Sequence, residues 1–294
     1  MVDRSPGDRL FDALVYALLS IVVLVVLYPL VFVLSASVSD PAAVMKGQVW
    51  LVPKDWTWVG YSRIFQSGEI VTGYRNTIVY TVVGTAINLA MTICAAYPLS
   101  RKDFHGRNAI MAFAVFTMFF SGGLIPNYLL VKNLGMLDTI WALVIPNAVA
   151  VWNIVIMRTF FQTSIPHEVQ ESASIDGCTD FQILFRIVLP LSLPIIAVMV
   201  LFYSVAHWNA FFNALIYLTD RDHYPLQLLL REILILGEMQ EMVDMSDASL
   251  AQKLLEVEAI KYAMVVVANL PVLLLYPFLQ KYFVKGVMIG AIKG

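Results

Sequence analysis

Long apolar runs dominate this chain and alternate with short polar segments. A helix needs about 20 mostly apolar residues to cross the hydrocarbon core of a bilayer. Six segments meet this requirement, at residues 11–34, 77–99, 109–131, 139–161, 191–216 and 260–283. The pattern predicts an all-α polytopic membrane protein, with residues 1–294 forming a single transmembrane domain of six membrane-spanning helices.

Two local features modify this pattern. Arg4 and Arg9 precede the first apolar segment, as in a signal peptide, but the segment is too long and lacks a clear cleavage site. It is therefore expected to stay in the chain as a membrane span. Ser121-Gly122-Gly123 lies within or at the end of an apolar run and is expected to break a helix.

Composition supports the membrane class. Apolar residues make up 60% of the chain and charged residues 14%, and the mean hydropathy is +0.76. A soluble domain usually carries about a quarter charged residues. The net charge of −2 gives no indication of nucleic-acid binding, and the two cysteines lie where they cannot form a disulfide framework.

Basic residues near the span ends predict the orientation. They are dense in the loop 100–108 and in the C-terminal tail, whereas the loop 132–138 holds a single lysine and the long loop 217–259 has nine acidic residues against three basic ones. We therefore expect both termini, the loop 100–108 and the segment 164–190 on the cytoplasmic side. The segments 37–76 and 217–259 are expected outside.

The predicted spans carry almost no ionisable side chains. His207 is the one that lies deep in a run, either as a satisfied bundle histidine or as a solute contact. The segment 167–171 lacks the second histidine of a zinc protease, and Tyr74 replaces the lysine that a phosphate-binding loop needs. With neither a proton relay nor an ATPase of its own, the chain is expected to be a pathway or scaffold whose energy comes from another subunit that contacts its cytoplasmic side.

The polar segment 164–190 separates the fourth and fifth spans and carries signals of a helix pair. Ser164 can cap a first helix, and Pro166 suits its first turn. Gly177 suits the left-handed residue that ends a helix. Helical spacing places one set of residues on a common apolar face: Ile165, Val169 and Ala173.

The second helix of this pair has its own start signal. Thr179 and Gln182 have the spacing of a capping box. Pro190 is expected to interrupt the helix as the chain enters the membrane. An ordinary solvated loop is the alternative for the whole segment.

These residues also fit a known pattern. Glu171-Ser172-Ala173, Gly177 and Ile187-Val188-Leu189-Pro190 have the spacing E-A-A-x3-G-x9-I-x-L-P, with Ser172 at the second position. The segment resembles the EAA loop of permease subunits in bacterial ABC importers. Further similarity at Leu189–Pro194 and Tyr282–Gly294 extends the resemblance over essentially the whole chain, to the maltose-type second permease of carbohydrate importers.

The resemblance implies a type I ABC importer transmembrane fold with a cytoplasmic coupling helix that docks on an ATP-hydrolysing subunit. The residues implied in this coupling are Glu171, Ser172, Ala173, Asp176, Gly177, Ile187, Leu189 and Pro190. Lys293 and Gly294 would reach between the ATPase subunits, or else form a frayed end. A bulky residue at Gly177 is expected to abolish transport and leave membrane insertion intact.

The implied partners are a second homologous permease subunit in a heterodimer, two ATP-binding subunits, a solute-binding protein and membrane lipid, with no nucleic acid. This chain would be a non-catalytic subunit without a cofactor or metal, because ATP and Mg would be held by the ATPase subunits. Its expected location is the bacterial cytoplasmic membrane.

Two sequence segments, Phe120–Pro126 and Tyr224–Ile233, resemble those of a subgroup of importers for larger oligosaccharides such as alginate and pectin fragments. An alginate-type acidic oligosaccharide is therefore the expected solute, although no basic cluster in the spans requires an anion. Polar and aromatic residues of spans four and five are candidate pathway residues, with helix packing as the alternative for each: Asn147, Trp152, Asn153, Tyr203, His207, Trp208, Asn209 and Asn213.

Other interpretations remain. The chain could be an ABC importer permease for a different solute, or a secondary carrier, which would need an inverted repeat and intramembrane ion ligands that are not visible here. A membrane scaffold or enzyme would need a catalytic constellation. The loop 217–259 is expected to reach a binding protein or to cap the bundle, and Trp50, Trp56, Trp58 and Tyr61 are expected to be interfacial anchors.

Overall fold

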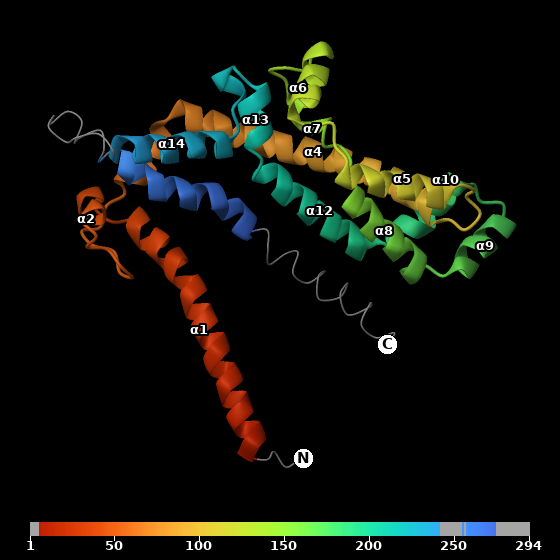
Figure 1. Cartoon of the computed structure of the whole chain (residues 1–294), viewed down its shortest axis with the longest axis horizontal. Helices are drawn as coiled ribbons and strands as arrows, with labels where there is room; N and C mark the ends of the chain where they lie inside the picture. Colours follow the sequence, from red (N-terminus) through yellow and green to blue (C-terminus); the bar gives the residue numbers. More distant parts are fainter. Residues whose placement is uncertain (1–5, 242–254, 256, 275–294) are drawn as a thin grey trace. The chain divides into compact units, whose positions relative to one another are not determined.

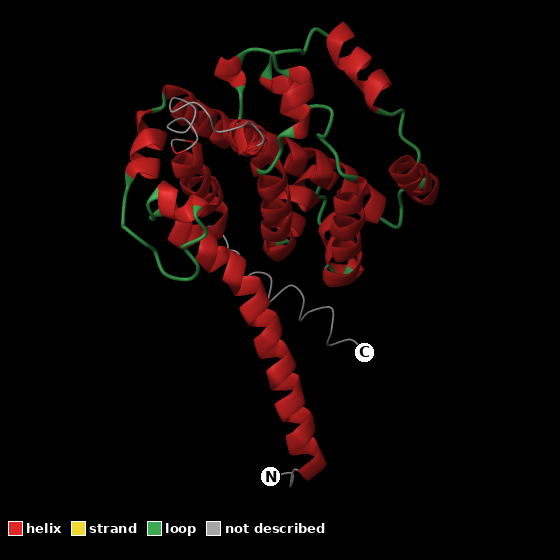
Figure 2. Ribbon diagram, turned by 60° about the vertical axis from the view of Figure 1, so that its left-hand side comes forward, coloured by secondary structure: helices red, strands yellow, loops and turns green. Residues whose placement is uncertain are grey.

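The computed structural model describes residues 6–241, 255 and 257–274, and this part of the chain consists of helices and connecting loops without a strand (Figures 1 and 2). The all-α prediction is confirmed for these residues. Internal contacts divide the chain into two compact units, residues 1–68 with 230–270 and residues 69–229 with 271–294. The single transmembrane domain predicted from the sequence stays a prediction, and each unit is described separately.

The first unit begins with the long helix α1 (Pro6–Ser37), which contains the predicted span 11–34. At about 1.5 Å per residue, its 32 residues reach well beyond the thickness of a hydrocarbon core. Its apolar side chains are exposed along nearly its whole length. This surface suits lipid or a protein partner better than water.

Short polar residues turn the chain back after α1. The hydroxyl of Ser35 donates to the carbonyl of Leu51 (2.7 Å), and that of Ser39 donates to the carbonyl of Ser35 (2.6 Å). The short helices α2 (Pro41–Met45) and α3 (Val59–Gln66) follow. A small core completes this unit, formed by Ala36, Ala43, Val44 and Val49 packed against Phe32 and Tyr262.

The second unit begins with α4 (Gly68–Ser100), which contains the predicted span 77–99. The remaining helices follow in chain order: α5 (Arg107–Phe119), α6 (Leu124–Asn133), α7 (Ile140–Val144), α8 (Val151–Ser164), α9 (His167–Ile175), α10 (Asp180–Ile183), the π-helical turn η1 (Leu184–Val188), α11 (Leu189–Leu191), α12 (Leu193–Trp208), α13 (Phe212–Tyr217), the 3-10 turn η2 (Arg221–His223) and the start of α14 (Leu226–Glu241).

Within the described part of the chain, three helices are long and apolar enough to span a membrane: Gly7–Ser37, Gly68–Ser100 and Val257–Leu274. Residues 275–283 of the predicted sixth span lie outside the described residues. Two further spans are bent pairs, α5 with α6 at 109° and the helices of Asp180–Leu191 with α12 at 82°. The exact count of six spans stays a prediction.

Three of the predicted spans are therefore not single helices, which corrects the expectation of continuous segments. In 109–131 the expected break is confirmed, because Gly123 has a positive φ of 86° that ordinary residues avoid. In 139–161, α7 ends at Val144 and α8 begins at Val151, and the chain turns between them at Pro146, which has no amide hydrogen to continue the helical hydrogen bonds. In 191–216 the chain bends at Ser192 and again leaves the helix after Trp208.

The core of the second unit surrounds α8. Met157 and Phe161 of α8 are almost completely buried, as are Ile183 of α10 and Met199 of α12. They form one cluster with residues at the carboxyl end of α4, including Ala96. This cluster joins the helices before and after the segment 164–190.

A polar clamp joins two loops at another end of the second unit. Asp138 has a positive φ of 56°, and its carboxylate accepts hydrogen bonds from the Thr219 hydroxyl (2.6 Å), the Thr219 amide (2.5 Å) and the Asp220 amide (3.0 Å). These donors stabilise the charged form and lower the pKa of Asp138 from 3.8 to about 2. Arg221 forms an ion pair with Glu69 nearby (3.1 Å).

We expect Asp138→Ala to speed hydrogen exchange at the Thr219 and Asp220 amides, measured by mass spectrometry, because the side chain that accepts from both is lost. Asp138→Glu is the control for charge, because it keeps the carboxylate but moves it one methylene further from the backbone, away from its position beside Thr219 and Asp220. Because folding lowers this pKa, the contribution of Asp138 is complete above the ordinary value of 3.8 and is lost as pH falls through about 2. Unchanged exchange in Asp138→Ala at neutral pH contradicts the clamp.

Candidate coupling element and polar cavity

Helix α9 starts later than the sequence suggests. Ser164 is the last residue of α8 and not a cap of α9, which corrects the expected start. The N-terminal flanking residue of α9 is Pro166, without a side-chain capping bond. Pro166 favours an extended residue before it, and Ile165 is extended and buried there. The chain therefore makes a sharp change of direction between α8 and α9.

The inner face of α9 is formed by Gln170 and Ala173, which are buried. Val169, which helical spacing places on one face with Ala173, is 37% exposed. The outer face presents Ile175, which is 86% exposed. Glu171 is also exposed and forms an ion pair with His167 one helical turn earlier (2.8 Å). The outer face thus combines a carboxylate with an unpartnered apolar side chain.

The turn after α9 matches the sequence expectation. Gly177 has a φ of +82°, and no heavy atom lies within 4 Å of where its Cβ would be. The turn therefore needs glycine for its backbone conformation rather than for space. Thr179 and Gln182 form both bonds of the predicted capping box at the start of α10.

The second helix does not stop at Pro190, contrary to the expectation. The chain passes through η1, in which the Leu189 amide donates to the Leu184 carbonyl five residues back. Pro190 then occupies the first turn of α11, where its missing N–H costs little. The actual bend lies at Ser192, where the helix direction changes by 82° before α12.

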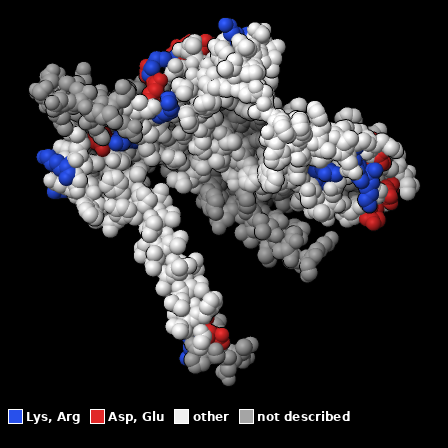
Figure 3. Space-filling view, viewed as in Figure 1, with Lys and Arg blue, Asp and Glu red and all other residues white. Residues whose placement is uncertain are grey.

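The other predicted coupling residues surround this pair. Asp176 flanks the carboxyl end of α9, Ser172 is exposed beside Glu171, Pro190 is exposed, and Ile187 and Leu189 are half-buried. Lys293 and Gly294 lie outside the described residues. In Figure 3, acidic and basic side chains gather at the end of the second unit that carries α9 and α10. Of the predicted residues, Glu171, Ser172, Asp176 and Gly177 are exposed on α9 and its turn, whereas Ile187 and Leu189 pack against the apolar core of the second unit.

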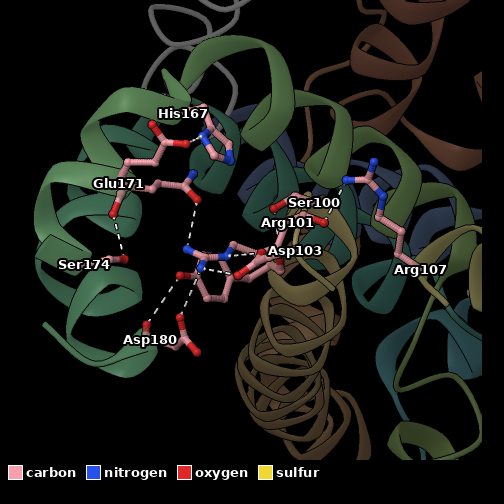
Figure 4. Close-up of polar contacts among 10 residues, drawn as sticks. Ser100, Arg101, Asp103, Arg107, His167, Glu171, Ser174 and Asp180 are labelled. Atoms are coloured by element: carbon pink, nitrogen blue, oxygen red, sulfur yellow. Dashed lines mark hydrogen bonds and ion pairs between the residues drawn. The ribbon is translucent and has the colours of Figure 1, made fainter. Parts of the chain in front are cut away.

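One arginine lies at the centre of this region (Figure 4). The guanidinium of Arg101 contacts the Asp103 carboxylate through two nitrogens (3.0 and 2.7 Å). It also donates to Gln170 Oε1 of α9 (3.2 Å) and lies 3.4 Å from Asp180 Oδ1 of α10. The hydrogen bond from Arg101 lowers the pKa of Asp103 below its ordinary value.

Side chains from α5 and α8 donate hydrogen bonds to the backbone carbonyls at the end of α4 and to the carbonyl of Arg101, the next residue. Arg158 donates to the Leu99 carbonyl (2.8 Å), Gln162 to that of Ser100 (3.4 Å) and Arg107 to that of Arg101 (2.8 Å). Carbonyls at a helix end have no partners within the helix and carry partial negative charge. These contacts fix the carboxyl end of α4 to α8.

A cavity of about 250 Å³ lies between α4, α12 and the 143–153 segment. Five of the predicted pathway residues line it: Asn147, Asn153, Tyr203, His207 and Asn213. The lining side chains include amides, hydroxyls and an imidazole, without Lys, Arg, Asp or Glu. Among the described residues, no group of three or more His, Cys, Asp or Glu could hold a metal ion.

Polar pairs across the cavity wall join α4 to its neighbours. His207 Nε2 lies 2.5 Å from Asn88 Oδ1, and Asn88 Nδ2 donates to the Asn147 carbonyl (2.6 Å). The hydroxyls of Thr92 and Tyr203 are hydrogen-bonded at 2.6 Å. His207 is therefore hydrogen-bonded within the bundle through Nε2 and also lines the cavity, so a role as a solute contact stays a prediction.

Three predicted pathway residues do not line this cavity. Trp152 is 61% exposed, the Asn209 side chain donates back to the Val205 carbonyl, and Trp208 packs edge-to-face on Tyr74. Conversely, sequence reasoning missed Asn88 and other lining residues of α4. Their spacing was the available signal, because polar or small residues recur every three or four positions at Thr77, Thr81, Gly84, Thr85, Asn88 and Thr92.

Comparison with known proteins defines the class. Residues 70–289 match the model of the family described as the binding-protein-dependent transport system inner membrane component. The chain belongs to this family, and it is an inner-membrane permease component of an ABC importer.

Named relatives and solved structures agree. The chain is 43% identical over 98% of its length to the polygalacturonan/rhamnogalacturonan transport system permease protein YtcP of Bacillus subtilis, covering 99% of that protein. It is 40% identical to Protein LplC of the same organism, covering 99% of this chain and 97% of that one. It also matches a chain of a bacterial ABC transporter involved in alginate import, with 34% identity, a TM-score of 0.87 and coverage of 96% and 100%. This likeness confirms the importer permease fold.

The close approach of α4 and α12 gives a test of the cavity wall. A methyl group at Gly84 would overlap the His207 ring, which is held by Asn88. We expect Gly84→Ala to displace the ring and lower the free energy of unfolding by about 1–3 kcal/mol. The measurement is the thermal unfolding midpoint in detergent. Gly122→Ala is the control, because its nearest neighbour is 3.8 Å away, and equal midpoints for both variants contradict the predicted overlap.

Proposed function

We propose that this chain is the permease subunit of an ATP-driven carbohydrate importer and forms half of the pathway for a solute delivered by a binding protein. The observation that carries this proposal is the α9–Gly177–α10 element, a helix pair with a defined turn and an exposed outer face. A protein partner can dock on that face because Glu171 offers charge and Ile175 offers unburied apolar surface. The printed functions of the relatives supply the solute class.

The partners follow from this assignment. Two ATP-binding subunits would hold ATP and Mg and carry out hydrolysis, while a second, homologous permease would complete the pathway. The helix pair and both termini would face the cytoplasm, as the basic residues near the span ends indicate. A solute-binding protein would dock on the outer side, as in the alginate importer solved with its alginate-bound periplasmic protein.

The cavity supports a polyhydroxylated solute. Amide and hydroxyl side chains can bond sugar hydroxyls, and the rings of Tyr80 and Tyr203 add apolar surface. No charged side chain of the described lining would select an acidic sugar. If the solute is an acidic oligosaccharide of the alginate or pectin type, its carboxylates would be recognised by the binding protein or the second permease.

The test of this function is ATP hydrolysis by the purified complex in proteoliposomes with loaded binding protein. Oligogalacturonate and alginate oligosaccharides form the acidic arm, maltooligosaccharide the neutral arm and a peptide the control arm. We expect stimulation by a carbohydrate arm and uptake of that sugar. Stimulation by the peptide alone, with none by any carbohydrate, contradicts the carbohydrate assignment.

Gly177 provides a test of the coupling element. Gly177→Val places a β-branched residue in the left-handed region, at a cost of roughly 1–2 kcal/mol or more. We expect it to abolish sugar uptake with normal membrane insertion, both measured on the reconstituted complex. Gly177→Asn is the matched control, since Asn tolerates this conformation and the space is open. Normal uptake and stimulation in Gly177→Val would show that the turn is not part of coupling.

A further inference from the structure

Arg101 is the only residue named in Figure 4 that reaches both helices of the 164–190 pair. Its side chain is 16% exposed. It donates to Gln170, before the Gly177 turn, and pairs with Asp180, after the turn. Because Arg101 directly follows the last residue of α4, one guanidinium joins three segments that are far apart in the sequence.

The two walls of the cavity are attached to this helix pair in different ways. Helix α12 carries Tyr203 and His207 and is continuous with α10 through η1, α11 and the bend at Ser192. Helix α4 carries Thr77, Tyr80 and Asn88. Along the chain, α4 reaches α9 only through α5 to α8 and their loops. Contacts in space must therefore connect the α4 wall directly to the pair.

We propose that Arg101 is the positioning residue that passes movement of the α9–α10 pair to α4. The inference rests on the proposed function, in which ATPase subunits move this pair. A displacement applied to α9 or α10 would act through Gln170 and Asp180 on the guanidinium. It would then act on the carboxyl end of α4, which Arg158 and Gln162 also fix to α8.

The chemistry of the guanidinium suits this role. Apolar contacts between Ala173, Ile183 and the end of α4 also join these helices, but they are non-directional. The planar guanidinium has five donors in a fixed arrangement. Two of its nitrogens are oriented by Asp103, so the contacts to α9 and α10 have a defined direction. A lysine could keep one charge contact but not this geometry.

The test uses the complete complex in proteoliposomes, with loaded binding protein and the sugar that stimulates the wild type. We expect Arg101→Met to lower the sugar transported per ATP hydrolysed about tenfold or more, since hydrogen bonds to charged groups are lost. Arg101→Lys should restore part of this ratio. Lys102→Met is the matched control, because it removes the neighbouring exposed cation and should leave the ratio unchanged.

A wild-type ratio in Arg101→Met overturns the inference. If that variant does not assemble, the double variant Gln170→Leu with Asp180→Asn keeps the arginine and removes its partners on the helix pair. A lowered ratio in this variant supports the role, and a wild-type ratio overturns it. Failure of the proposed function is distinguishable, because the wild-type complex would then show no sugar-stimulated hydrolysis at all.

Discussion

Hydrocarbon offers no hydrogen-bonding partners, so polar side chains within a membrane bundle must find them in protein or in an enclosed polar space. In the second unit α4 carries most of these side chains. Thr77 accepts from the Leu226 amide (2.8 Å), Tyr80 donates to the His223 carbonyl (2.8 Å), and Asn88 and Thr92 bond α12. This stripe therefore joins α4 to α12 and to the residues at and before the start of α14, although the buried hydroxyls of Thr81 and Thr85 have no hydrogen-bond partner among the described residues.

The same constraint explains where the helices break. Irregular backbone at membrane depth is tolerated where it is covered by protein or lines a cavity. Residues near two of the breaks, Asn147 and Asn213, line the polar cavity next to α4. Asn147 and Asn213 also line a neighbouring hollow of about 550 Å³. Ser121, close to the break at Gly123, lines the same hollow. The breaks therefore supply polar groups to one connected region of the second unit.

Much of the helix pair could be predicted, because its signals are local. A capping box and a glycine turn depend on residues three or four positions apart, and Thr179, Gln182 and Gly177 behave as their types suggest. The start of α9 and its inner face could not be predicted in this way. The polar Gln170 is buried there and accepts a hydrogen bond from Arg101, 69 residues earlier, a contact that no local pattern indicates. Long-range pairs such as Asn88 with His207 were likewise hidden, although their spacing along α4 marked one face.

The proposed coupling role requires the α9–α10 pair to keep its own shape while its ends move. In the α9–α10 pair, a positive-φ glycine and a capping box fix the internal angle. The π-turn and the bend at Ser192 then change direction without interrupting the chain of helices. Ser192 is completely buried, and its hydroxyl has no hydrogen-bond partner among the described residues. Such a group costs about 1–3 kcal/mol, so stability alone does not account for a serine at this bend. The bend changes the helix direction by 82° between α11 and α12, the helix that carries Tyr203 and His207 of the cavity wall.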